Sequence, residues 1–291
     1  MNIIQVIILA VVQGLAELLP ISSSAHVVVA EKLMGLDPSS PAMTLLLVML
    51  HTGTMFAVIV YFWKQWRDTY FASASAFKQY ASLLIVATVL TGIVGEVLIK
   101  IIEKTAFRGQ PKAEVEQLFS HLELIAPALA AAGILILIAG LYERRHAGVN
   151  VNLQDVNKIG MKEAGLIGVV QGLCLPFRGF SRSGATISTG ILAGVPKLRA
   201  EAFSFALAVI LTPPVVAREA LRLAKAEHIQ TAGNLGSAVL PSLLGAVFSF
   251  LAGLLALKWL SSWLEKGQWY LFGIYCLLAA GVVAALHHAG Y

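Results

Sequence analysis

The hydrophobic positions along this chain fall in long continuous runs rather than in short alternating ones. A helix that crosses a bilayer needs about 20 mostly apolar residues, whereas the strands of a membrane barrel alternate apolar and polar side chains. One apolar run, residues 203–217, is short for a span, and because it contains Pro213 and Pro214 the residue at which its helix ends is not defined by the sequence. The pattern predicts six membrane-spanning helices, at residues 43–63, 80–102, 122–142, 203–217, 235–257 and 270–286.

Two further apolar regions, residues 3–35 and 164–196, are interrupted by proline, serine and glycine. Each is too long for one span and too polar in its middle for two ordinary spans. The sequence Val-Val-Gln-Gly-Leu begins at Val11 and recurs at Val169, and in both copies a proline and a group of serines follow. A match of five residues can arise by chance, but the shared order of all these features favours a duplication.

A broken apolar segment in each half of a duplicated chain is typical of membrane proteins that bind a ligand near the bilayer midplane. We therefore predict an all-α fold, a polytopic membrane helix bundle with an inverted repeat and two re-entrant, proline-broken helical hairpins. Residues 1–291 would form a single transmembrane domain, with repeat halves at approximately 1–145 and 160–291. The one linker of soluble character, 150–157, lies between the two halves.

The composition agrees with a membrane protein, since 58% of the residues are hydrophobic and 13% are charged, against roughly 25% charged in soluble proteins. The net charge is +5. In a membrane protein such an excess indicates cytoplasmic loops that face anionic lipid, so we expect no nucleic-acid partner. The lysines and arginines place the connections near 64–78 and 144–162 in the cytoplasm, and the 103–121 connection outside.

The first broken segment contains a single charge before residue 31, the carboxylate of Glu17. A carboxylate in a bilayer costs about 2.5–3.5 kcal/mol on insertion scales, so such a residue needs a compensating role. Gln13 lies one helical turn earlier on the same face, and the two side chains could together bind a hard divalent cation, Mg²⁺ or Ca²⁺. The alternatives are that Glu17 extends toward the membrane surface or forms a structural pair with an arginine.

Directly after Pro20 comes a run of three hydroxyl groups, Ser22, Ser23 and Ser24, followed by His26. A serine becomes a useful nucleophile when a base lies beside it, and His26 lies three residues beyond Ser23. Helix capping by the serines and an interfacial histidine would explain the same residues without chemistry.

The second broken segment carries a dense polar group between two uncharged stretches. Its arginines offer donors that match phosphate oxygens, and its glycines allow the backbone to approach a ligand. A positive loop at the cytoplasmic surface would explain the arginines but not the hydroxyl groups around them. We expect an anion-binding site formed by Arg178, Gly179, Ser181, Arg182, Ser183 and Thr186.

The two segments are complementary, because one supplies a carboxylate, a hydroxyl and an imidazole and the other supplies an anion clamp. This combination indicates phosphoryl chemistry. The sequence has no Walker A motif, so energy coupled to nucleotide hydrolysis is not expected.

The two segments resemble those of the undecaprenyl-diphosphate phosphatases of the bacitracin-resistance type. The likeness is most specific at residues 13–26 and 179–188, and 50–54 is similar to a third, less diagnostic stretch. It implies a bacterial inner-membrane hydrolase that removes the terminal phosphate of a C55 isoprenoid diphosphate and so recycles the lipid carrier for cell-wall synthesis. It also implies a divalent-cation requirement and a site that opens toward the periplasm.

The resemblance also implies roles for particular residues. Gln13 and Glu17 would bind the metal or orient the diphosphate, Ser23 would be the nucleophile, and His26 its acid–base partner. Arg182 would hold phosphate, with help from the serines and the threonine around it. The expected partners are an isoprenoid diphosphate lipid and membrane lipid, and a homodimer is left open.

Two residues depart from the family pattern. Gln13 stands where many relatives have glutamate, and Arg178 stands where the family usually has proline. Three alternatives remain at this point: attack by a metal-activated water in place of Ser23, a flippase for polyprenyl phosphate, and a non-catalytic lipid-binding scaffold.

Overall fold

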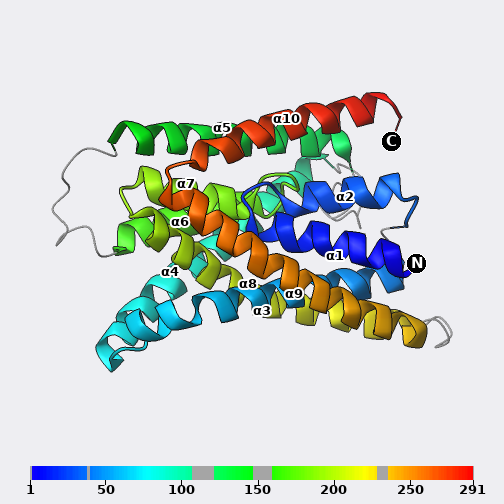
Figure 1. The fold of residues 1–291 in the computed structure, drawn as a ribbon, viewed down its shortest axis with the longest axis horizontal. Coiled ribbons are helices and arrows are strands. Elements are labelled where there is room, and N and C mark those ends of the chain that lie inside the picture. Colours follow the sequence, from blue (N-terminus) through cyan, green and yellow to red (C-terminus); the bar gives the residue numbers. More distant parts are fainter. Residues whose placement is uncertain (1, 38–39, 107–120, 147–158, 228–234, 291) are drawn as a thin grey trace.

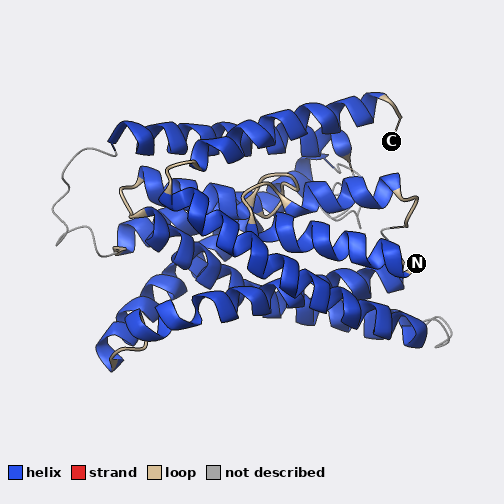
Figure 2. Ribbon diagram, viewed as in Figure 1, coloured by secondary structure: helices blue, strands red, loops and turns tan. Residues whose placement is uncertain are grey.

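The computed structural model describes residues 2–37, 40–106, 121–146, 159–227 and 235–290, and every regular element in these ranges is a helix (Figures 1 and 2). Six of the described helices are long and apolar enough to cross a membrane, which confirms the predicted helical membrane protein. They are α3 (Pro41–Thr69), α4 (Ala74–Ala106), α5 (Leu122–His146), α8 (Lys197–Glu227), α9 (Leu235–Glu265) and α10 (Trp269–His288).

The helix at α8 is longer than the apolar run that predicted it. It begins six residues before Phe203 and continues through Pro213 and Pro214 without a break. Proline is tolerated within membrane helices because neighbouring helices and hydroxyl side chains satisfy the freed backbone groups. The predicted linker at 150–157 lies outside the described residues.

Each of the two broken apolar segments forms a pair of short helices. The first pair is α1 (Ile3–Leu18) and α2 (Ser23–Leu33), and the second is α6 (Met161–Cys174) and α7 (Arg182–Leu192). The longest of them, α1, has 16 residues and rises about 24 Å, which is less than the roughly 30 Å of a hydrocarbon core. Neither pair can therefore span a bilayer with a single helix, and re-entry from one surface remains a prediction.

The two short-helix pairs approach the centre of the molecule from opposite ends. In Figure 1, α1 and α2 extend toward the end where the N-terminus lies, and α6 and α7 extend toward the other end. Their connecting loops meet near the middle, where Figure 2 shows loop segments surrounded by helices. This arrangement supports the predicted inverted repeat.

Several helix contacts follow the same correspondence between halves. The pairs α3 with α8 and α5 with α10 each join equivalent helices of the two halves, while α1 packs on α9 as its counterpart α6 packs on α4. The extensive packing of α3 on α9 has only a small counterpart between α8 and α4, so the correspondence is partial. The division at approximately 1–145 and 160–291 remains a prediction.

Small residues allow the closest of these contacts. At the α5–α10 crossing, a Cβ added to Gly273 would lie 2.6 Å from the Leu137 backbone nitrogen and 2.7 Å from the Gly133 carbonyl oxygen. Glycine is common at such crossings in membranes because helices associate there through close backbone packing rather than through a hydrophobic effect.

We predict that Gly273→Ala lowers the unfolding temperature in detergent, because the new methyl group would push α10 away from α5. Overpacking of this kind costs about 1–3 kcal/mol. The matched control is Gly281→Ala on the same helix, where an added Cβ meets no atom within 4 Å. Equal unfolding temperatures for the two variants would contradict close packing at this crossing.

Candidate active site between the two broken segments

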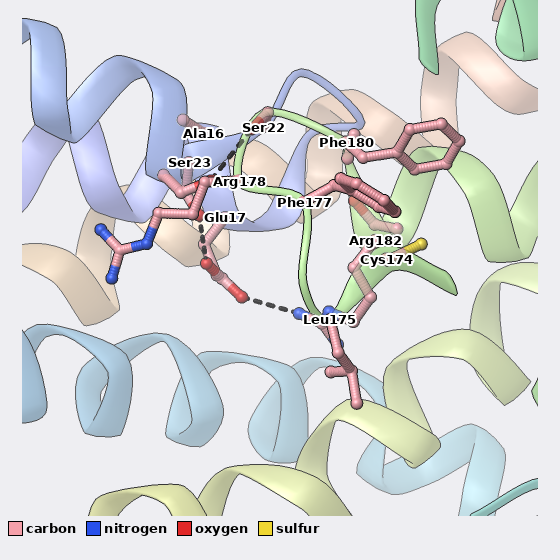
Figure 3. A pocket seen from close by; sticks show the side chains of 13 residues that line it. Ala16, Glu17, Ser22, Ser23, Cys174, Leu175, Phe177, Arg178, Phe180 and Arg182 are labelled. Carbon is pink, nitrogen blue, oxygen red and sulfur yellow. Dashed lines mark hydrogen bonds and ion pairs between the residues drawn. The ribbon is translucent and has the colours of Figure 1, made fainter. Parts of the chain in front are cut away.

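The loops that connect the short helices enclose a cavity of about 210 Å³ (Figure 3). Both broken segments contribute to its wall, as the complementary chemistry of the two segments predicts. The predicted site residues that line it are Glu17, Ser22, Ser23, Ser24, Arg178, Ser181, Arg182 and Ser183.

Glu17 lies at the centre of the polar contacts in this cavity. Its Oε1 accepts a hydrogen bond of 2.7 Å from Arg182 Nη2, so an ion pair joins the first half of the chain to the second. Its Oε2 accepts hydrogen bonds from Ser23 Oγ at 2.5 Å and from Gln13 Nε2 at 3.2 Å. The Glu17 side chain is 16% exposed and that of Arg182 is 24% exposed, so both charges are largely removed from solvent.

A histidine from α3 completes the surroundings of this carboxylate. His51 Nε2 lies 3.8 Å from Glu17 Oε2. The sequence placed His51 in the third, less diagnostic stretch and assigned it no role. His51 lies far from Glu17 in the sequence, so their spacing could not indicate a contact. Only the packing of α3 beside α1 brings the two side chains together.

The backbone before Ser23 has an unusual conformation that directs its side chain. Ser22 has φ of 68°, the one positive φ at a non-glycine residue in the described chain. Its hydroxyl caps α2 by accepting a hydrogen bond from the Ala25 N–H. Such a conformation costs of order 1–3 kcal/mol and is found where the surrounding structure enforces it. It turns the chain sharply after Pro20, so that Ser23 starts a new helix with its hydroxyl on Glu17.

His26 does not contact Ser23 through a hydrogen bond in the structure. Its Nδ1 lies 2.7 Å from the Ser22 carbonyl oxygen, and its Nε2 lies 2.8 Å from the hydroxyl of Tyr275 on α10. The His26 and Tyr275 rings also stack, with centroids 5.7 Å apart. The acceptor of the Ser23 hydrogen bond is therefore Glu17, and His26 instead supports the strained Ser22 backbone.

The second loop is held against the first by backbone and hydroxyl contacts. Gly179 has φ of 98°, and its N–H donates to Ser24 Oγ at 3.3 Å. A side chain at Gly179 would also place Cβ 2.5 Å from the Ile125 carbonyl oxygen, so glycine is required there on two grounds. Ser181 caps α7 by accepting from the Gly184 N–H.

Thr186 lies behind the cavity rather than in its wall. It is fully buried, and its hydroxyl lies 2.6 Å from Ser204 Oγ on α8. Thr186 lies four residues after Arg182 on α7, which is about 6 Å further along the helix axis. The threonine side chain is too short to reach the cavity from there, whereas the Arg182 side chain is long enough to reach Glu17. Thr186 therefore joins α7 to α8, and Ser183, which does line the cavity, donates weakly to the Leu19 carbonyl oxygen at 3.4 Å.

The two arginines of the second loop point in different directions. Figure 3 shows Arg182 directed at Glu17, and Arg178 directed away from it on the other side of the cavity. Arg178 interacts electrostatically with Glu31 of α2, whose side chain is 1% exposed. The sequence analysis assigned no role to Glu31, although a carboxylate in this apolar segment is a signal of the same kind as Glu17.

Comparisons with known proteins agree with this geometry. Residues 6–283 match the family described as bacitracin resistance protein BacA. The chain belongs to this family. It is 58% identical to undecaprenyl-diphosphatase 2 of Acinetobacter baylyi, with 98% of each chain covered. It is 32% identical to undecaprenyl-diphosphatase 2 of Burkholderia ambifaria over 94% of this chain and 92% of the relative, and 29% identical to undecaprenyl-diphosphatase of Parabacteroides distasonis over 98% of each.

The resemblance led us to expect that Gln13 and Arg178 depart from the family pattern, and both lie beside a carboxylate. Gln13 is 1% exposed, and its amide donates a hydrogen bond to Glu17. Arg178 interacts with Glu31. The structure therefore gives each of these two residues a charged or polar partner.

The side chains around Glu17 do not by themselves form a closed cation site. Among the described residues no three histidine, cysteine, aspartate or glutamate side chains cluster around a point where a metal could sit. Glu17 is the single carboxylate in the cavity wall, and Arg182 and Ser23 already bond to its two oxygens. Mg²⁺ is usually held by one or two carboxylates together with substrate phosphates, so the expected cation would depend on oxygens of the substrate.

We predict that neutral His26 carries its proton on Nδ1, because the Ser22 carbonyl can only accept a hydrogen bond. Tyr275 would then donate to Nε2, and Tyr275→Phe would shift the ¹⁵N resonance of Nε2. Nitrogen NMR on ¹⁵N-histidine-labelled protein in detergent measures both the protonation of Nδ1 and the shift of the Nε2 resonance. His146, whose Nδ1 faces the Tyr142 carbonyl at 2.8 Å, is the internal control and should not shift. A resonance of unprotonated Nδ1 in the parent would contradict the assignment.

Proposed function

We propose that this chain hydrolyses undecaprenyl diphosphate to undecaprenyl phosphate and inorganic phosphate. The observation that carries the proposal is the Ser23–Glu17–Arg182 arrangement, in which one carboxylate contacts both a nucleophilic hydroxyl and a phosphate-binding cation. Relatives over nearly the full chain bear the name undecaprenyl-diphosphatase, which supports the same substrate. The description of the family as bacitracin resistance protein BacA fits the same activity.

The shape of the site suits a lipid with a compact anionic headgroup. A cavity of about 210 Å³ accommodates a diphosphate but not a C55 chain. Leu175 and Phe177 line the cavity and are 44% and 45% exposed, so they offer an apolar exit for the prenyl chain toward lipid. The headgroup would bind at Arg182 while the chain stays in the bilayer.

The chemistry follows from the contacts of Glu17. Ser23 Oγ attacks the terminal phosphorus, and its proton passes to Glu17 Oε2, which already accepts that hydrogen bond. The new Oγ–P bond forms as the bond from phosphorus to the bridging oxygen breaks, and undecaprenyl phosphate leaves with the electron pair. Water then attacks the phosphoserine, Glu17 returns a proton to Ser23 Oγ, and inorganic phosphate is released.

Transfer of the Ser23 proton to Glu17 would also change the contacts of Arg182. In the resting site its guanidinium pairs with the Glu17 carboxylate. Once Glu17 takes the Ser23 proton that pair weakens, and the guanidinium is available to the negative charge on the phosphoryl oxygens. The transfer of one proton would thus strengthen the phosphate clamp during the step that needs it. This coupling favours Glu17 over His26 as the proton acceptor.

We also propose that a divalent cation enters with the substrate. A diphosphate carries more negative charge than Arg182 and Arg178 can neutralise, since each of them has a glutamate beside it. Glu17 and Gln13 would contact the cation together with the diphosphate oxygens. When bound, the cation would supply additional charge neutralisation at the phosphates.

The proposed location is the bacterial inner membrane, with the cavity open toward the periplasm. Support comes from the basic residues Lys64, Arg67 and Arg144, which lie at the ends of α3 and α5 and so mark one end of the bundle as cytoplasmic by the positive-inside rule.

We predict that purified protein in detergent releases phosphate from undecaprenyl diphosphate, and that Ser23→Ala, Glu17→Gln and Arg182→Gln each lower kcat/KM by at least about a hundredfold. Arg67→Gln, an exposed arginine outside the cavity, is the control and should keep parental activity. Detergent removes membrane sidedness, so a flippase without hydrolase activity would release no phosphate and would refute the proposal. Elution as a single species in size-exclusion chromatography excludes misfolded variants.

The same variants distinguish a phosphoserine intermediate from direct attack by water on the diphosphate. Rapid quenching of the parent with ³²P-labelled substrate should trap phosphate on Ser23, and Ser23→Ala should trap none. Activity of Ser23→Ala within about tenfold of the parent would exclude Ser23 as the nucleophile and leave the activated water.

We predict that EDTA abolishes phosphate release and that Mg²⁺ or Ca²⁺ restores it. Because the described residues alone form no closed site, the protein without substrate should bind the cation weakly, with a dissociation constant that falls when a non-hydrolysable diphosphate lipid is added. Isothermal titration with and without that lipid measures the difference. Full activity in EDTA would contradict the cation requirement while leaving the phosphatase proposal intact.

A further inference from the structure

The loop that leads to Ser23 is held by two consecutive residues of α10. The hydroxyl of Tyr275 lies 2.8 Å from His26 Nε2, and the Cys276 thiol donates to the Pro20 carbonyl oxygen at 3.3 Å. These contacts join residues that are 249 and 256 positions apart in the sequence. The last described helix of the chain therefore contacts the serine loop both where the loop begins and where α2 begins.

The conformation of this loop is one that its own sequence does not favour. Ser22 has φ of 68°, and a positive φ is uncommon for residues other than glycine. The His26 ring fixes the Ser22 peptide group, because Nδ1 donates to the Ser22 carbonyl oxygen at 2.7 Å. Ser23 follows directly, so the same peptide group sets the direction of its hydroxyl, which lies 2.5 Å from Glu17 Oε2.

His26 can hold the Ser22 carbonyl only while its own ring is oriented. An imidazole that donates from Nδ1 has an acceptor at Nε2, and the Tyr275 hydroxyl is the donor that faces this acceptor. The two rings also stack, with an angle of 13° between their planes, so the tyrosine restricts the tilt of the imidazole. The orientation of His26 thus depends on a side chain from the opposite end of the sequence.

Close packing of α10 on α5 fixes the position of Tyr275. A Cβ added to Gly273, two residues earlier, would lie 2.6 Å from the backbone of α5. Cys276 is fully buried, and a Cβ added to Gly133 of α5 would lie 3.0 Å from the Cys276 Cβ. The second loop rests on the same pair of helices, since a Cβ at Gly179 would lie 2.5 Å from a carbonyl oxygen of α5. Together α5 and α10 support both loops of the candidate active site.

We propose that Tyr275 is a positioning residue for the nucleophile. Through His26 and the Ser22 carbonyl it keeps the Ser23 hydroxyl on Glu17. Tyr275 is outside the described wall of the cavity, so it acts through the turn and not on the diphosphate. This inference rests on the proposed function, because it takes Ser23 to be the group that attacks phosphorus.

The kinetic test compares Tyr275→Phe with the parent in detergent. Loss of the hydroxyl should lower kcat for undecaprenyl diphosphate about three- to tenfold, the effect of one hydrogen bond between helices, and should leave KM within about twofold because Arg182 is untouched. Tyr142→Phe is the matched control, since Tyr142 is also a half-exposed tyrosine that packs on a histidine, His146, outside the cavity wall. Tyr142→Phe should keep the parental kcat and KM.

Two further measurements separate positioning from general destabilisation. Because Tyr275 acts through His26, the double variant His26→Phe/Tyr275→Phe should be no slower than His26→Phe alone. Amide hydrogen exchange, measured by mass spectrometry without substrate, should become faster at residues 20–26 in Tyr275→Phe and stay parental at residues 176–184.

Faster exchange in the serine loop, together with a lower kcat and an unchanged KM, supports the proposal. It is overturned by a parental kcat in Tyr275→Phe, by additive losses in the double variant, or by exchange that rises equally in both loops. If the parent releases no phosphate, the proposed function is wrong, and the exchange at residues 20–26 alone then decides whether Tyr275 holds the turn.

Discussion

The ion pair between Glu17 and Arg182 is the contact on which the rest of this site depends. It joins side chains 165 residues apart, and it fixes the end of α1 and the start of α7 at the same depth in the molecule. Removal of one partner from such a buried pair costs about 3–5 kcal/mol, since the other charge is then left without compensation. The pair therefore serves the fold and the chemistry together, and neither residue can be lost without affecting both.

The architecture could be predicted from the sequence because the bilayer allows few solutions. Long apolar runs must be helices, and the two runs broken at Pro20 and Pro176 could not be ordinary spans. The meeting of Glu17 with Arg182 was also predictable, because an isolated carboxylate and an anion clamp occupy equivalent places in two similar segments.

Individual partners could not be predicted, because they depend on side-chain direction and on helices distant in sequence. The spacing of Ser23 and His26 is compatible with a hydrogen bond, yet Tyr275 from α10 and the Ser22 carbonyl occupy both ring nitrogens. Thr186 matches the family motif but bonds to Ser204 on α8. In both cases a tertiary neighbour decided between options that the local sequence left equal.

The capping serines have a further electrostatic consequence. Ser22 and Ser181 begin α2 and α7, and both loops border the same cavity, so the amino ends of two helices converge on it. Each helix dipole places about half a positive charge at its amino end. Part of the attraction for an anionic headgroup thus belongs to the main chain, where no side-chain substitution can remove it. Inside a bilayer, where counterions are scarce, this fixed field would favour entry of a diphosphate before any arginine is engaged.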